Sequence, residues 1–175
     1  NFKIFSRKEI IQNITKEFFT ISVAGTHGKT TTSSLLTHIL YEGHCNLTSF
    51  LGGITKNYET NLVTYGNYQN TNVVIEADEY DRFFLCLKSN IAIVTTMDGD
   101  HYDVFHDFKN YKQSFKTFLD NTKLHGVVIL HKSVYEQLIE QDKDYDFYMD
   151  YYDVENAPIH AENISVDENN FFHFD

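Results

Sequence analysis

The sequence has no uninterrupted apolar stretch of the roughly 20 residues that a membrane-spanning helix needs, and its first residues lack the pattern of a secretory signal peptide. Proline occurs once and glycine eight times in 175 residues, which leaves little room for linkers and favours a single domain. The two cysteines, Cys45 and Cys86, lack the spacing of a metal site. We therefore expect two reduced thiols in a cytoplasmic protein, with one disulfide as the alternative.

Basic residues are also scarce: 14 Lys and Arg stand against 25 Asp and Glu, and the formal net charge is −11. Proteins that bind the nucleic-acid backbone carry a basic face, so this balance argues against such binding. It leaves nucleotides open, because a few backbone N–H groups, one lysine and a metal ion can hold a phosphate chain. Apolar residues make up 42% of the chain, enough for a folded core.

Apolar runs alternate with amphipathic stretches along the chain. Buried-type strands are expected at residues 19–24, 47–51, 72–77, 90–96, 126–130 and 145–149. Helices are expected at residues 6–18, from about 33 to 43, 108–123 and 133–139. The second helix is expected to bury Leu35, Leu36, Ile39 and Leu40 and to end at Gly43, and Ser133 to cap the last helix. Residues 55–72 suit a loop or a hairpin flap, residues 83–85 a short helical segment, and the pair Gly52-Gly53 a turn or a backbone surface near a ligand. This pattern predicts an α/β fold with a mostly parallel sheet flanked by helices, and antiparallel β structure from about residue 159.

The stretch at residues 20–32 predicts a buried strand, a tight glycine turn and the start of a helix. Gly25 and Gly28 allow backbone N–H groups to turn toward an anion, and the helix start adds its own unpaired N–H groups. Lys29 supplies a positive charge for a phosphate, and Thr30 supplies a hydroxyl suited to Mg²⁺. A valine occupies the position of the first glycine of the full pattern G-x-x-x-x-G-K-[ST]. An ordinary strand–turn–helix with a solvated lysine is the alternative.

Two acidic clusters follow two of the expected strands. They consist of Glu76, Asp78 and Glu79 after the strand at 72–77, and of Asp98, Asp100, His101 and Asp103 after the strand at 90–96. Because the carboxyl ends of parallel strands meet at one edge of a sheet, both clusters are expected near the glycine turn. Carboxylates beside phosphates need a cation, and Mg²⁺ takes such oxygen ligands. Imidazole is a less usual ligand for Mg²⁺, so His101 could instead act on substrate or through a water. Either cluster alone could simply cap a helix or face solvent.

Three motifs in this order resemble the Mur ligases. Residues 24–32, Ala-Gly-Thr-His-Gly-Lys-Thr-Thr-Thr, resemble the shortened ATP loop of that family, which accounts for the valine. The segments Glu76-Ala77-Asp78-Glu79 and Asp100-His101-x-Asp103 are similar to those of the branch that adds L-alanine. The resemblance covers about residues 18–130, with weaker support beyond.

The resemblance implies an ATP-dependent, amide-forming ligase of peptidoglycan synthesis, with ATP and Mg²⁺ as cofactors and UDP-N-acetylmuramate and L-alanine as substrates. In that family ATP phosphorylates the substrate carboxylate, and the amine of the amino acid attacks the acyl phosphate. Lys29 would stabilise the γ-phosphoryl group during transfer, and Thr30 and Glu76 would hold Mg²⁺. His101 would hold a second Mg²⁺, and Glu79 is a weaker candidate for the metal site. The implied nucleotide-binding residues are Gly25, Thr26, His27, Gly28, Lys29, Thr30 and Thr31.

The family has three domains, and residues 1–175 resemble most of the central ATPase domain, without the preceding UDP-binding domain or the following amino-acid-binding domain. We expect that the chain does not complete ligation alone. Several relatives carry a carbamylated lysine on the helix after the Asp-His motif, whereas Phe115 occupies that place here, as the alanine-adding branch would suggest. The alternatives are a murein-peptide recycling ligase of the same family, a nucleotide-binding module without ligase chemistry, and an α/β scaffold that binds no phosphate.

Overall fold

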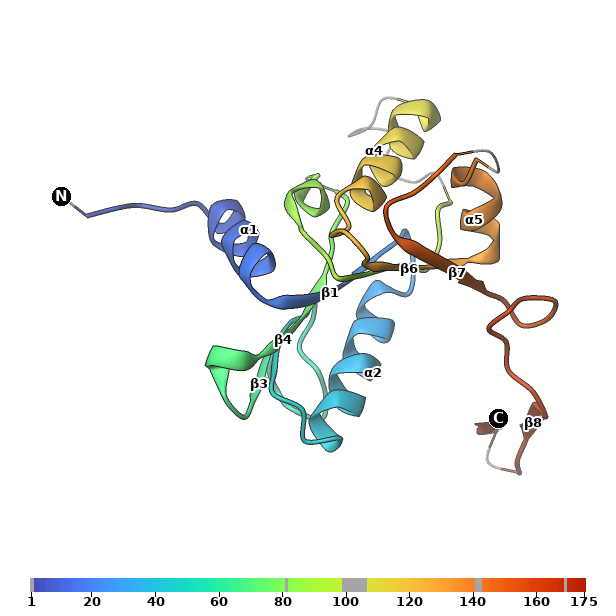
Figure 1. Cartoon of the computed structure of the whole chain (residues 1–175). Coiled ribbons are helices and arrows are strands. Elements are labelled where there is room, and N and C mark those ends of the chain that lie inside the picture. Colours follow the sequence, from blue (N-terminus) through green and yellow to red (C-terminus); the bar gives the residue numbers. More distant parts are fainter. Residues whose placement is uncertain (1, 81, 99–106, 141–142, 169) are drawn as a thin grey trace.

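The computed structural model describes residues 2–80, 82–98, 107–140, 143–168 and 170–175. At its centre is a seven-stranded sheet whose neighbouring strands follow the order β3-β2-β4-β1-β5-β6-β7 (Figure 1). The strands are β1 (Phe19–Ala24), β2 (Leu47–Phe50), β3 (Leu62–Tyr65), β4 (Asn72–Glu76), β5 (Ile91–Val94), β6 (Val127–His131) and β7 (Tyr148–Tyr152). All neighbours run parallel except β2 and β3, which are antiparallel. The predicted α/β class is confirmed.

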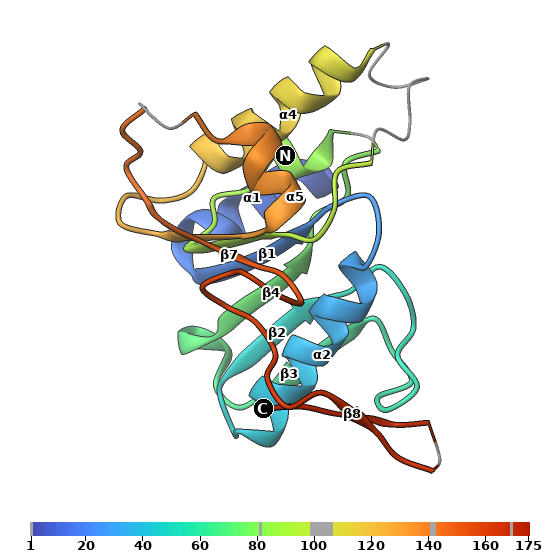
Figure 2. The same ribbon diagram turned by 90° about the vertical axis from the view of Figure 1, so that its right-hand side faces the viewer.

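Helices cover both faces of this sheet (Figures 1 and 2). They are α1 (Arg7–Glu17), α2 (Lys29–Glu42), α4 (Phe108–Asp120) and α5 (Lys132–Leu138), with short 3-10 helices η1 (Tyr68–Asn70) and η2 (Phe83–Cys86). Helix α2 lies on one face, and α1, α4 and α5 lie on the other. Because both faces are covered, the central strands need apolar or small side chains at successive positions, as the sequence of β1 and β4 provides.

The core between the sheet and α4 is built largely from aromatic rings. The Phe84 ring lies 5.2 Å from that of Phe115 and 5.4 Å from that of Phe118, centroid to centroid, and all three side chains are buried. Helix α4 supplies two of these rings because its apolar residues share one face, as their spacing predicts. Phe115, which stands where some relatives are expected to carry a modified lysine, is therefore part of the hydrophobic core.

Helix α2 packs on the sheet through hydroxyl side chains, and the expected apolar face is wrong at two positions. Leu35 and Ile39 are each 58% exposed, whereas Ser33 and Thr37 are fully buried. The Thr37 hydroxyl lies 2.7 Å from the Ser33 carbonyl oxygen and 2.9 Å from Oγ of Ser49 on β2. Small side chains let the helix approach the sheet closely, and these hydrogen bonds satisfy the hydroxyls that the contact buries.

Several helix ends also differ from expectation. Helix α2 begins at Lys29, about one turn earlier than predicted. Gly43 closes it with φ −74°, and the left-handed conformation is adopted instead by His44, at φ 55°. Helix α5 is capped by His131 and not by Ser133, because the imidazole of His131 accepts a hydrogen bond from the Ser133 backbone N–H. The predicted capping box of α1 is present.

The C-terminal part forms a two-stranded antiparallel sheet of β8 (Ser165–Val166) and β9 (Phe172–His173), as predicted. Strand β7 begins three residues later than expected. The segment predicted as a loop or a hairpin flap at 55–72 contains β3, which pairs antiparallel with β2 and so forms a hairpin. Both cysteines are free thiols, so the disulfide alternative is wrong. Within the described ranges, no helix is long and apolar enough to cross a bilayer.

Candidate functional site

The carboxyl ends of three neighbouring strands bring the predicted motifs together. Strand β1 lies between β4 and β5, and in register Val23 pairs with Glu76 while Ala24 pairs with Val94. The glycine turn that follows β1 therefore lies beside the acidic end of β4 and the threonine pair that follows β5. This meeting is the one expected for parallel strands.

The glycine turn packs against and is hydrogen-bonded to the residues that follow β5. Gly25 and Gly28 have φ of +130° and +82°, and a Cβ on Gly25 would collide with the Thr95 hydroxyl and the backbone of Thr96. The Thr26 N–H donates to the Thr96 carbonyl oxygen over 3.0 Å. These two positions therefore need glycine, one for its close approach and both for their backbone conformation.

Helix α2 starts at this turn without a side-chain cap, since its N-cap residue is Gly28. The first N–H groups of a helix have no partner within the helix, and the helix dipole places partial positive charge there. This 14-residue helix thus presents N–H donors and positive potential where the glycine turn ends, an arrangement that suits an anion. Thr31, in its first turn, is exposed.

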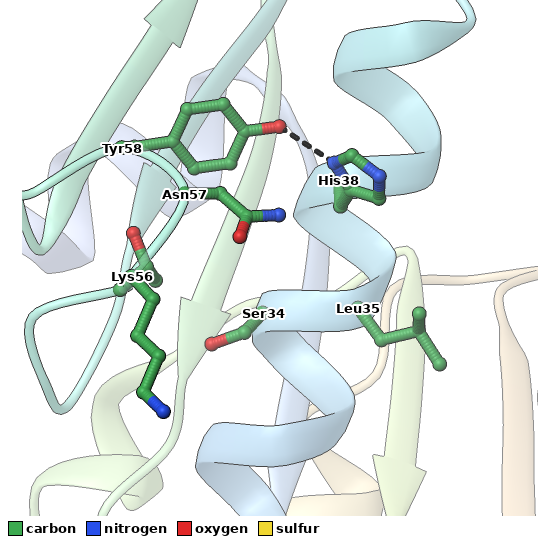
Figure 3. Close-up of a pocket in the computed structure, with 7 residues that line it drawn as sticks. Ser34, Leu35, His38, Lys56, Asn57 and Tyr58 are labelled. Carbon is green, nitrogen blue, oxygen red and sulfur yellow. Dashed lines mark hydrogen bonds between the residues drawn. The ribbon is translucent and has the colours of Figure 1, made fainter. Parts of the chain in front are cut away.

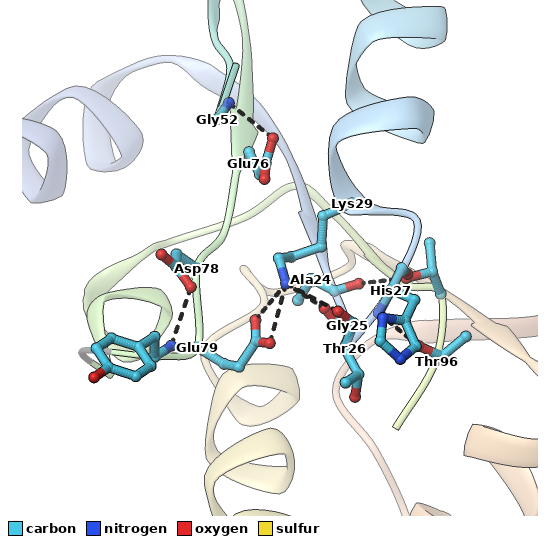
Figure 4. A network of polar contacts seen from close by, with 12 residues as sticks. Ala24, Gly25, Thr26, His27, Lys29, Gly52, Glu76, Asp78, Glu79 and Thr96 are labelled. Carbon is cyan, nitrogen blue, oxygen red and sulfur yellow. Dashed lines mark hydrogen bonds and ion pairs between the residues drawn. The ribbon is translucent and has the colours of Figure 1, made fainter. Parts of the chain in front are cut away.

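Lys29 is held by an ion pair and by the turn itself (Figure 4). Its Nζ lies 2.9 Å from Oε2 of Glu79 and donates to the Gly25 carbonyl oxygen over 2.6 Å. The side chain of Glu79 is completely shielded from solvent and that of Lys29 is 14% exposed. Burial raises the pKa of the Glu79 carboxyl, while the hydrogen bond and the charge of Lys29 act in the opposite direction.

Glu76 has different partners from Glu79. Its Oε1 accepts a hydrogen bond from the Thr30 hydroxyl over 2.8 Å, and its Oε2 accepts one from the Gly52 N–H over 2.8 Å. Glu76 is half-buried at the end of β4, next to the first turn of α2. The carboxylate beside the threonine hydroxyl is thus Glu76, whereas Glu79 is occupied by Lys29.

The structure describes one of the two histidines predicted for the site. The side chain of His27 is 67% exposed, and its Nε2 lies 3.9 Å from Oδ2 of Asp98. His101 lies outside the described residues, as do Asp100 and Asp103. Among the residues that the structure does describe, no three His, Cys, Asp or Glu side chains gather as a metal site.

Tyr111 is a contact of the turn that sequence reasoning missed. Its hydroxyl lies 2.7 Å from Oγ1 of Thr26, and the same Oγ1 accepts a hydrogen bond from the Asp98 N–H over 3.0 Å. Tyr111 is fully buried on α4, where the sequence indicated only a core residue. The available signal was chemical, because a buried phenol needs a hydrogen-bond partner.

A recess of about 260 Å³ lies between α2 and the chain that follows β2 (Figure 3). It is lined by Ser34, Leu35, His38, Thr55, Lys56, Asn57 and Tyr58. None of these is a predicted site residue. A second cavity, of about 320 Å³, does adjoin the site, because Gly52, Glu76 and Asp78 contribute to its wall together with Arg7.

The glycine turn, the uncapped helix start and the lysine are the features that the phosphate-binding loops of α/β proteins share. A family model described as the Mur ligase middle domain matches residues 23–174. The chain therefore belongs to the Mur ligase family.

Two curated relatives share the name UDP-N-acetylmuramate–L-alanine ligase. The relative from Flavobacterium psychrophilum is 51% identical over 122 residues, covering 70% of this chain and 27% of the relative. The relative from Parabacteroides distasonis is 39% identical over 171 residues, covering 97% of this chain and 36% of the relative. The chain thus spans about a quarter to a third of the length of these relatives.

A solved structure supports the same assignment. The UDP-N-acetylmuramate–alanine ligase MurC of Thermotoga maritima matches with a TM-score of 0.72 and 26% identity, over 91% of this chain and 35% of that one. The fold is thus that of a Mur ligase.

Proposed function

We propose that this domain binds Mg²⁺–ATP and serves a ligase that joins L-alanine to UDP-N-acetylmuramate in peptidoglycan synthesis. The observation that carries the proposal is the uncapped start of α2, which has Lys29 on one side and the Thr30–Glu76 pair on the other. The names of the curated relatives support the choice of substrates. We place this reaction in the cytoplasm, where free thiols such as those of Cys45 and Cys86 stay reduced.

The residues around the turn fit a nucleotide with its cation. The turn from Gly25 to Gly28 and the first N–H groups of α2 would hold the phosphates, with Thr26, His27 and Thr31 around them. Lys29 would stabilise the γ-phosphoryl group in transfer, since phosphoryl transfer depends on positioning and on charge neutralisation. Glu79 fixes the Lys29 ammonium in the loop.

Thr30 and Glu76 together fit Mg²⁺. Mg²⁺ prefers oxygen ligands, is commonly bound by one or two carboxylates and phosphate oxygens, and retains waters. The Thr30 hydroxyl and the Glu76 carboxylate are already in contact, at the edge where β- and γ-phosphates would lie. When bound, Mg²⁺ would neutralise the phosphate charge. His101 is proposed as a ligand of a second Mg²⁺.

The cavity of about 320 Å³ lies on the acceptor side of Glu76 in this proposal. It gives the substrate carboxylate a route to the transferred phosphoryl group, and Arg7 in its wall offers a positive charge to an acidic group. The acyl phosphate formed there would be attacked by the amine of L-alanine, with loss of inorganic phosphate.

Titration with ATP in the presence of Mg²⁺ tests the nucleotide site on this chain. Calorimetry should show saturable binding by the wild type and at least about tenfold weaker binding by Lys29→Ala, because charge-assisted bonds to a phosphate contribute about 1.5–3 kcal/mol. Lys16→Ala is the matched control, because it removes an exposed lysine in the last turn of α1, which precedes β1 and so lies at the opposite edge of the sheet from the turn. Equal affinity of Lys29→Ala and wild type, or no binding by either, would contradict the assignment.

Substrate choice separates the proposed ligase from its alternatives. A protein that carries this domain together with the remaining ligase domains should form UDP-N-acetylmuramoyl-L-alanine and release ADP. Transfer of a tripeptide in place of L-alanine would favour the recycling ligase. ATP binding without any acyl transfer would favour a nucleotide-binding module.

A further inference from the structure

The backbone N–H of Gly52 holds one oxygen of the Glu76 carboxylate (Figure 4). The Gly52 N–H donates to Oε2 over 2.8 Å, and the Thr30 hydroxyl donates to Oε1 over 2.8 Å. Gly52 follows β2, which pairs with β4 in the sheet, so its backbone is fixed relative to the strand that carries Glu76. The orientation of the carboxylate is thus set by two neighbours on different elements.

The missing side chain of Gly52 makes this contact possible. A Cβ there would meet Oε1 of Glu76 first and would lie 2.5 Å from Cδ and 2.6 Å from Oε2, closer than real Cβ atoms approach. A Cβ on the next residue, Gly53, would have Cγ2 of Thr30 as its nearest neighbour, at 3.8 Å, which is ordinary van der Waals contact. Gly52 does not have a positive φ, so the backbone conformation does not require glycine here. Glycine is required because the Glu76 carboxylate occupies the space that a Cβ would fill.

We propose that Gly52 is a positioning residue for the divalent cation, and that it makes Glu76 a one-oxygen ligand suited to Mg²⁺. With Oε2 held by the backbone N–H, Oε1 is the oxygen presented beside the Thr30 hydroxyl. Mg²⁺ demands near-octahedral geometry and keeps several waters, so it takes few ligands from the protein, whereas Ca²⁺ accepts both oxygens of one carboxylate. The inference rests on the proposed Mg²⁺–ATP site and adds to it the residue that orients the metal ligand.

The substitution Gly52→Ala should separate metal binding from folding. The atoms that an added methyl would meet are the far end of a flexible side chain, so the carboxylate can turn away while the backbone stays in place. We expect the Mg²⁺ concentration for half-maximal ATP binding to rise about tenfold, the size expected when one hydrogen bond to a charged group is lost. The preference for Mg²⁺ over Ca²⁺ should fall in the same variant. Thermal midpoints should stay close to that of the wild type.

Gly53→Ala is the matched control, because it adds the same methyl one residue along without meeting Glu76. It should change the half-maximal Mg²⁺ concentration by less than about twofold. The double variant with Glu76→Gln gives a second test: once the carboxylate is gone, Gly52→Ala should have little further effect on Mg²⁺ dependence. Should Gly52→Ala fail to fold, the Gly52 amide resonance of the folded wild type should shift on addition of Mg²⁺–ATP more than that of Gly53.

The outcomes distinguish this inference from the proposed function. ATP binding by the wild type that is absent or independent of Mg²⁺ would overturn the proposed function, and the inference with it. Mg²⁺-dependent binding by the wild type with equal Mg²⁺ dependence in Gly52→Ala and Gly53→Ala would overturn the inference alone. Fully additive effects of Gly52→Ala and Glu76→Gln would do the same.

Discussion

Lys29 and Glu79 form an ion pair that is almost completely shielded from water, with 14% and 0% of their side chains exposed. Removing charges from water is costly, and the cost is offset only where the partners are close and hydrogen-bonded. Here the ammonium also donates to carbonyl oxygens of the turn, at Gly25 and Thr26. The lysine proposed for the phosphate is therefore kept in place by a carboxylate that the sequence marked only as a weaker metal candidate.

The raised pKa of Glu79 predicts how Glu79→Gln changes the pH dependence of stability. Between the ordinary carboxyl pKa of about 4.3 and the raised pKa of the folded state, the unfolded chain has released this proton while the folded chain retains it. The stability that this group contributes is thus fully present below that pH and is lost as the pH rises through the raised pKa. Glutamine has no such proton to lose. The free energy of unfolding of Glu79→Gln minus that of the wild type should therefore increase with pH.

Urea denaturation at a series of pH values from about 4 to about 8 measures this difference. Glu136→Gln on α5, at an exposed position, corrects for the general effect of removing a carboxylate. A difference that is flat or that decreases over this range would show that the carboxyl is not destabilised in its ionised form. The expected sign follows because burial raises the pKa of Glu79 by more than the charge of Lys29 lowers it.

At the scale of elements, the sequence predicted strands better than helix faces. Strands β1, β4 and β5 were located because buried parallel strands have apolar or small residues at successive positions. The orientation of α2 was not predictable in this way, since its contact with the sheet uses Ser33 and Thr37 while leucine and isoleucine side chains point outward. Hydrophobic periodicity carries no information about a helix that packs through hydroxyls.

Helix α4 and the glycine turn are joined by the hydroxyl of Tyr111, and Tyr111→Phe tests what this contact does. The variant keeps the buried ring with its neighbour Phe115, 5.0 Å away, and deletes only the oxygen that contacts Thr26. We expect ATP affinity to fall about three- to tenfold, the equivalent of about one hydrogen bond, because the turn loses a constraint on its geometry. Calorimetric titration with Mg²⁺–ATP gives the affinity.

Tyr65→Phe is the control for this variant. Its hydroxyl also makes one side-chain hydrogen bond, 3.0 Å from Nδ1 of His44, at the opposite end of α2 from the turn. Tyr65→Phe should leave ATP affinity unchanged. An equal loss of affinity in both variants would assign the effect to general destabilisation, and no loss in Tyr111→Phe would show that the contact is structural only.

In the whole molecule, the site joins segments that are far apart in the sequence: residues 25–30, 52, 76–79 and 95–98. Their meeting was predictable, since parallel strands place their carboxyl ends at one edge. The group that each carboxylate contacts was not predictable from the sequence. Glu76 ends β4 in register with Val23, whereas Glu79 lies three residues further on and reaches Lys29. That difference depends on how the chain turns after the strand, which strand periodicity does not encode.

Nucleotide binding should therefore change amide exchange in several separate segments at once. With Mg²⁺–ATP at about 100 times its dissociation constant, binding stabilises the liganded state by about 2.7 kcal/mol. Amides whose opening releases the ligand should exchange up to about a hundredfold more slowly. We expect this slowing at residues 24–33, at 50–54 and at 76–80, because the contacts of Lys29, Thr30 and Glu76 connect these three segments at the sheet edge.

Hydrogen exchange read by mass spectrometry provides internal controls for this experiment. The hairpin β8–β9 extends away from the turn in both views of the chain, so its amides should exchange at the same rate with and without Mg²⁺–ATP (Figures 1 and 2). The variant Lys29→Ala should show at most about tenfold slowing at 24–33 under the same conditions, because its affinity is expected to be at least about tenfold weaker. Slowing confined to one of the three segments would mean that the sheet edge does not act as a single site, since a ligand held by all three must suppress the opening of each.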